Sequence, residues 1–92
     1  MIITKIDEPN VEISDGKIKI IALKKNVEEI DLPTSWAIKD LGNNVTITSN
    51  PKTRVISITN RTTSECIVCK SVEYMDALRK YHVQQRIEKT FK

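Results

Sequence analysis

The sequence predicts an α+β fold, with a small, mostly antiparallel β-sheet or half-barrel of five or six strands and one C-terminal α-helix packed on it. Apolar and polar residues alternate in several short segments of the first two thirds, turn sequences separate these segments, and the last twenty residues contain neither Gly nor Pro. With 92 residues, the chain is expected to form a single domain, β-rich over 1–69 and helical over 70–92.

The first predicted element is a hairpin. Segments 11–14 and 17–20 both alternate, and Asp15-Gly16 lies between them. This pair is a strong hairpin signal, because Asp and Gly both tolerate the positive φ angles of a type I′ turn. Beyond residue 20 the apolar positions shift to Ile21 and Leu23. We interpret the shift as a β-bulge or as a strand buried on both faces.

The next segment is ambiguous. Asn26 predicts a turn into the apolar segment 27–32. Residues 33–42 fit a short helix that ends before Gly42, and fit equally a strand at 36–39 followed by a turn. Between these two alternatives, we favour the strand.

The second hairpin is clearer. Residues 45–48 alternate with β-branched side chains, 50–53 form a proline turn, and 54–59 return as the partner strand. A polar loop at 60–64 leads to a short apolar strand at 65–69. The residues expected to form the core of the sheet are Ile18, Ile20, Leu23, Val45, Ile47, Ile56, Ile58 and Ile67.

The last element is a helix from Ser71 to Lys89 or beyond, with Ser71 as its N-cap. A stripe suited to packing on the sheet consists of Tyr74, Ala77, Leu78 and Tyr81, with Met75 at its edge.

A second apolar stripe, Val83, Ile87 and Phe91, lies on nearly the opposite side of this helix. One monomeric sheet covers one face of a helix, so the stripe needs its own explanation. Either the last turns fray or bend over the sheet edge, or the stripe packs on a second copy or another protein. We predict the second alternative and assign these residues to an interface.

Cys66 and Cys69 have the only motif-like spacing. Ile67 and Val68 between them favour a strand, where residues three apart point to opposite faces and cannot pair. With His82 they offer three zinc ligands, one fewer than a structural site requires. We therefore expect two buried or half-buried structural cysteines, no metal and no cofactor. Because no nucleophile–base pair and no glycine-rich phosphate loop occurs, we expect no enzyme.

Charge is distributed unevenly along the chain, with a net charge of −2 over residues 1–50 and +5 over residues 51–92. A basic half can contact phosphate or an acidic protein surface. Against nucleic-acid binding, aromatic residues suited to base stacking are few and no DNA- or RNA-binding signature occurs. The cations that such binding would use are Lys52, Arg54, Arg61, Arg79, Lys80, Arg86 and Lys89.

The sequence leaves two main hypotheses for the function, and a thiol or zinc protein that uses Cys66 and Cys69 is a third. The first is a small, non-enzymatic binding or regulatory protein that acts through protein–protein contacts and self-associates through the C-terminal helix. The alternative is an accessory factor that binds nucleic acid through the basic half. No segment approaches the roughly 20 apolar residues of a membrane span, and no secretory signal is recognisable, so we expect a cytoplasmic protein without membrane contact.

Overall fold

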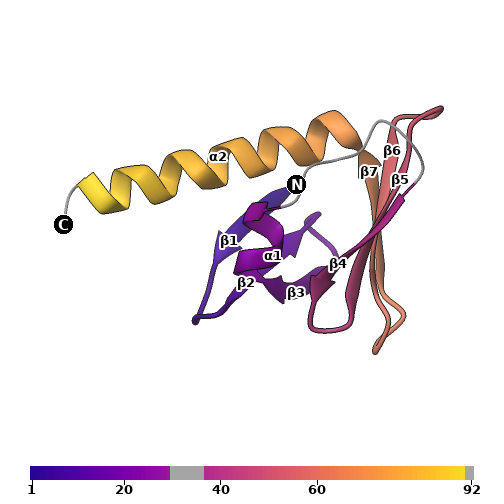
Figure 1. Ribbon diagram of the computed structural model, residues 1–92, viewed down its shortest axis with the longest axis horizontal. Helices are drawn as coiled ribbons and strands as arrows, with labels where there is room; N and C mark the ends of the chain where they lie inside the picture. Colours follow the sequence, from indigo (N-terminus) through magenta and orange to yellow (C-terminus); the bar gives the residue numbers. More distant parts are fainter. Residues whose placement is uncertain (30–36, 91–92) are drawn as a thin grey trace.

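The computed structural model describes residues 1–29 and 37–90, with side chains placed as far as Arg86. Two antiparallel sheets and two helices make up this part of the chain (Figure 1). In chain order the elements are β1 (Ile2–Lys5), β2 (Asn10–Ser14), β3 (Lys19–Leu23), α1 (Lys24–Glu29), β4 (Ala37–Gly42), β5 (Val45–Asn50), β6 (Val55–Asn60), β7 (Cys66–Lys70) and α2 (Ser71–Thr90).

The first sheet has the order β1-β2-β3. Ile3 pairs with Ile13, which pairs with Ile20, and all three are buried on the inner face. The predicted hairpin is present, but the prediction of a two-residue type I′ turn was wrong. The connection contains four residues, because Asp15 Oδ1 accepts hydrogen bonds from the N–H groups of Lys17 and Ile18 at 2.8 Å and closes a wider turn.

The predicted bulge near Ile21 is also absent from β3, whose register against β2 is continuous. Ile20 and Ala22 are buried while Ile21 and Leu23 are half-buried, so the original alternation persists. Asn26 was expected in a turn but lies within α1, where Val27 is fully buried. A buried side chain anchors this short helix to the sheets.

The second sheet has the order β4-β5-β6-β7 and includes the predicted hairpin. The strand alternative for the ambiguous segment is confirmed over residues 37–39, whereas Trp36 lies outside the described residues. β4 continues to Gly42, at φ +80°, where the register against β5 shifts. A methyl group at this position would collide with Leu23, so only Gly fits where the two sheets meet.

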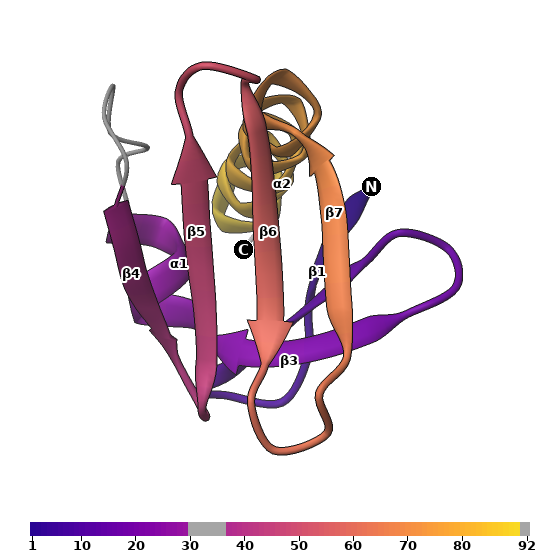
Figure 2. The same ribbon diagram turned by 90° about the vertical axis from the view of Figure 1, so that its right-hand side faces the viewer.

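The predicted α+β class with a C-terminal helix is confirmed, but the prediction of a single sheet of five or six strands was wrong. Helix α1 interrupts the succession of hairpins, so the strands divide into separate groups of three and four. Figure 2 shows β4–β7 in front, with β3 crossing steeply behind them. The inner faces of the two sheets enclose one apolar core, as in orthogonally packed sheets.

The predicted core is largely confirmed. Ile20, Val45, Ile47, Ile56, Ile58 and Ile67 are at most 1% exposed, whereas Ile18 and Leu23 are only partly buried. Six further core residues come mainly from elements that the sequence left unassigned or ambiguous. They are Ile3, Val11, Ile13, Ala22, Val27 and Leu41.

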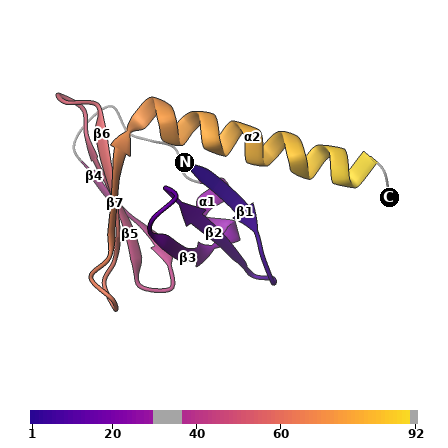
Figure 3. The same cartoon turned by 180° about the vertical axis from the view of Figure 1, so that it is seen from behind.

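Helix α2 closes the open side of the two sheets and contacts both β1 and β7 (Figure 3). The predicted stripe faces inward, since Tyr74, Ala77, Leu78 and Tyr81 are all at most 7% exposed. Ser71 does not use its hydroxyl as an N-cap acceptor. Its Oγ donates to the Arg54 carbonyl at 2.9 Å and thereby ties the start of the helix to the β5–β6 turn.

Candidate functional site

The side of α2 that points away from the sheets carries exposed apolar side chains. Val72, Met75 and Val83 are 61%, 43% and 46% exposed, and Arg79 is exposed between them. Their spacings of three and four residues place them on one side of the helix. We call these four residues the outer face of α2. A row of exposed apolar side chains on a monomer is typical of a contact surface.

A shallow hollow of about 480 Å³ lies along this outer face. Its apolar side chains are Met75, Leu78 and Val83, and its cationic rim contains Arg79 and Arg86. Leu78 is 7% exposed, so the hollow extends from the outer face to the edge of the core. The outer face therefore combines a hollow, apolar side chains at its bottom and positive charge at its rim.

The second half of α2 extends beyond the sheets. Twenty helical residues span about 30 Å at 1.5 Å per residue. Figures 1 and 3 show the first turns over the sheets and the last turns continuing past β1 toward the C-terminus. Tyr81 is the last buried side chain of the helix among those described, through Arg86. The described side chains that follow it, residues 82–86, are exposed or only partly buried, so this stretch of the helix is accessible to a neighbour.

One contact fixes the direction in which α2 extends. The Tyr81 hydroxyl donates a hydrogen bond of 2.9 Å to Glu28 Oε1 on α1. Tyr81 is 1% exposed, so this bond is partly shielded from solvent. It joins the two helices where α2 leaves the core.

Of the predicted interface residues, Val83 lies on the outer face. The side chain of Ile87 and all of Phe91 lie outside the described residues. Sequence reasoning missed Val72, which it left unassigned, and Met75, which it placed at the edge of the buried stripe. The spacing of Val72, Met75, Arg79 and Val83 was the signal that would have grouped them.

The predicted nucleic-acid contacts do not form one continuous surface. Lys52 and Arg54 lie in the β5–β6 turn, whereas Arg61 lies in the β6–β7 loop at the opposite end of the sheet (Figure 2). Arg61 Nη2 donates to Asn44 Oδ1 at 3.2 Å and joins two loops. Arg79, Lys80 and Arg86 are exposed on α2, and the side chain of Lys89 lies outside the described part.

The two cysteines occupy one strand, as expected, and both are unpaired thiols. Cys69 is partly buried on the inner side next to the core, as predicted. The prediction was wrong for Cys66, which is exposed because it lies on the outer face of β7. Burial, helped by the nearby Glu73 carboxylate, raises the pKa of Cys69 to about 11. A thiol with this pKa stays protonated at neutral pH and is a poor nucleophile.

His82 is partly buried, and its ring meets that of Tyr81 edge to face at 5.6 Å between centroids. Among the described residues, no three His, Cys, Asp or Glu side chains are grouped in a way that suits a metal ion. No helix in the same part of the chain combines the length and apolar character needed to cross a lipid bilayer.

Comparison with known proteins gives no further assignment, because no protein family, curated protein or solved structure matches this chain.

Proposed function

We propose that this protein is a small, non-enzymatic binding protein that acts through protein–protein contacts and self-associates through the outer face of α2. The observation that carries the proposal is the group of exposed apolar side chains on a helix that extends beyond its own sheets. Burial of these side chains against a neighbour would remove apolar surface from water, which is the main favourable term in association.

An antiparallel pair of α2 helices suits the residue spacing. Two-fold symmetry makes residue i of one copy contact residue j of the other, and the reverse. With the axis near Arg79, Met75 faces Val83 of the second copy, and Asp76 faces His82 of the second copy. Each Arg79 stays close to its own Asp76, at 3.6 Å, which offsets part of the repulsion between the two arginines at the axis.

Such an interface involves one helix from each copy, so it falls at the lower end of specific interfaces, below roughly 1,200 Å². We therefore expect association at micromolar concentrations. Sedimentation velocity from about 5 to about 500 µM should show a monomer–dimer equilibrium.

The double variant Met75→Asp with Val83→Asp should remain monomeric over the whole range, because both apolar contacts become buried carboxylates. Ile38→Asp is the matched control, since Ile38 is 71% exposed and lies on β4, the edge strand of the second sheet, instead of α2. It should dimerise like the unmodified protein. A monomer at every concentration in the unmodified protein, or equal dimerisation of all three, would contradict the proposal.

A second candidate, nucleic-acid binding, is supported by the cations beside the start of α2. Ser71 N–H and Oγ both donate to the Arg54 carbonyl at 2.9 Å, and Lys70 pairs with Val55 next to it. Lys52, Arg54 and Lys70 are therefore neighbours, and all are exposed. Phosphate binding needs only cations of this kind.

Fluorescence anisotropy with labelled duplex DNA and RNA tests this candidate at about 50 mM salt. Lys52→Glu with Arg54→Glu should abolish binding, and Arg61→Glu at the other end of the sheet should have a smaller effect. Absence of binding by the unmodified protein at this salt concentration would remove the candidate.

A further inference from the structure

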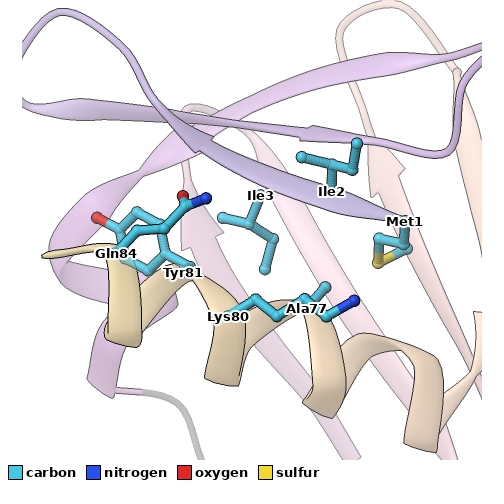
Figure 4. A pocket seen from close by; sticks show the side chains of 7 residues that line it. All are labelled: Met1, Ile2, Ile3, Ala77, Lys80, Tyr81 and Gln84. Carbon is cyan, nitrogen blue, oxygen red and sulfur yellow. The ribbon is translucent and has the colours of Figure 1, made fainter. Parts of the chain in front are cut away.

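A groove separates the edge strand β1 from α2 (Figure 4). Ile2 and Ile3 both line it, although Ile2 is 67% exposed and Ile3 only 3% exposed. Neighbouring residues of a strand point to opposite faces. In Figure 4, Ile3 points toward the helix and Ile2 lies on the other side of the strand. A groove that reaches both side chains must follow the edge of β1.

This edge has no strand beside it. Among the described residues β1 pairs with β2 alone, at the end of the sheet order β1-β2-β3. An edge strand presents outward-pointing N–H and C=O groups that can pair with another extended chain. The opposite wall of the groove is a single stripe of α2, formed by Ala77, Lys80, Tyr81 and Gln84.

The size and chemistry of the groove suit side chains of an extended peptide. Its volume of about 270 Å³ lies just below the roughly 300–1,000 Å³ of small-molecule sites. Ile3, Ala77 and Tyr81 give it an apolar floor, and Lys80 supplies a cation. Lys5 follows Ile3 by two residues on the same side of β1 and is exposed. No acidic side chain occurs among the described residues that line the groove.

We propose that the groove between β1 and α2 binds an extended peptide segment of a partner protein, which pairs with the free edge of β1 as an added strand. Its inward side chains alternate with outward ones. An apolar residue lies over Ile3 and Ala77, and a carboxylate lies near Lys80. Backbone pairing provides affinity, and the alternating side chains provide selectivity. This site uses a different stripe of α2 from the outer face, so it does not depend on self-association.

The first test uses fluorescein-labelled nine-residue peptides in which valine alternates with glutamate, serine or lysine. Fluorescence polarisation should rank the glutamate peptide tightest and the lysine peptide weakest. Lack of binding by all three at about 1 mM peptide, or the reverse order, would overturn the proposal.

Backbone pairing is tested separately with N-methylated glutamate peptides. N–H groups of alternate residues point to opposite edges of a strand. Methylation of every valine in one peptide and of every glutamate in another therefore blocks one edge each. Only one of these two peptides should lose binding, by at least tenfold. Equal affinity of both would mean that no strand pairing occurs.

Charge selectivity is tested with Lys80→Glu. This variant should weaken the glutamate peptide by about threefold to tenfold and strengthen the lysine peptide, as expected for an exposed charge reversed in sign. Arg79→Glu is the matched control, because Arg79 is the neighbouring residue but does not line the groove. Both variants should keep the folded signal in circular dichroism. Equal changes in both would overturn the role of Lys80.

The double variant Met75→Asp with Val83→Asp separates the two proposals. It should bind the glutamate peptide with unchanged affinity even though it is monomeric. If it loses peptide binding while circular dichroism shows it folded, the groove is not independent of the outer face and this inference fails.

Discussion

Two buried tyrosines on α2 should respond in opposite directions to the same substitution. Tyr74 is 0% exposed, and its hydroxyl has no hydrogen-bond partner among the described residues. Tyr81 is 1% exposed, and its hydroxyl donates to Glu28 Oε1 at 2.9 Å. Tyr→Phe removes one oxygen atom in each case and leaves the ring in the core.

The expected magnitudes follow from these partners. A buried polar group without a partner costs about 1–3 kcal/mol, whereas a hydrogen bond to a charged group contributes about 1.5–3 kcal/mol. The small void left by the oxygen offsets part of the gain at Tyr74. We therefore expect Tyr74→Phe to raise the free energy of unfolding by about 1 kcal/mol. Tyr81→Phe should lower it by about 1.5 kcal/mol.

Urea denaturation followed by circular dichroism measures both values, with the unmodified protein under identical conditions. For a domain of this size, 1 kcal/mol corresponds to a shift of about 4–8 °C in Tm. The two variants should therefore separate by well over 5 °C in a thermal scan. The reasoning is refuted if Tyr74→Phe is destabilised as much as Tyr81→Phe.

Three further results are expected. Gly42→Ala should lower the free energy of unfolding by about 2–3 kcal/mol, because residue 42 has a positive φ and the added methyl group collides with the Leu23 side chain. Gly16→Ala, which also has a positive φ but open space around it, should lower it by about 1 kcal/mol. Urea unfolding compares the two variants, and equal losses would contradict the packing argument. Burial, followed by the charge of nearby Cys69, raises the pKa of Tyr74 from about 10 to about 12. Between these two pH values the unfolded state loses the tyrosine proton and the folded state keeps it. The free energy of unfolding should therefore fall by up to about 2.7 kcal/mol as pH rises from 10 to 12. Tyr74→Phe should show a shallower loss over that range, and an identical slope would exclude this tyrosine as the cause. Iodoacetamide at pH 8 should alkylate Cys66 faster than Cys69 by at least tenfold, measured by mass spectrometry of digested protein, and similar rates would contradict the burial of Cys69.

The strands and the terminal helix could be predicted where the pattern was local. The alternation in 45–48 and the stripe from Tyr74 to Tyr81 each depend on neighbours within one element, and both agree with the structure. The type of the first turn could not be predicted from Asp15-Gly16 alone. The Asp15 side chain accepts two backbone hydrogen bonds and forms a four-residue turn, whereas the dipeptide by itself favours a two-residue turn.

The division into two sheets could not be predicted in this way. It depends on whether residues 24–29 form a helix, and tertiary contacts favour that outcome: Val27 is fully buried, and the Asn26 side chain donates a hydrogen bond to the Asp40 carbonyl at 3.1 Å. Strand β1 was likewise missed, because only one of its four side chains, Ile3, is buried. Its strand conformation depends on pairing with β2, where Ile3 lies opposite Ile13. Short elements of this kind are decided by tertiary contacts rather than by their own pattern.

The candidate surfaces followed the same rule. Val83 was identified from helical spacing, which is local. The groove between β1 and α2 was not, because it exists only when the two ends of the chain meet.

The same meeting of the two ends has a consequence for how the molecule folds. Each sheet consists of sequential antiparallel neighbours, so its hairpins close short loops and can form early. The contact between β1 and α2 instead joins residues about seventy positions apart, and such long-range closure slows folding. Until α2 docks, the side of the apolar core that this helix covers stays open to solvent. Native structure is therefore completed when α2 docks, and a variant that lacks residues 74–90 leaves one side of the core without a cover.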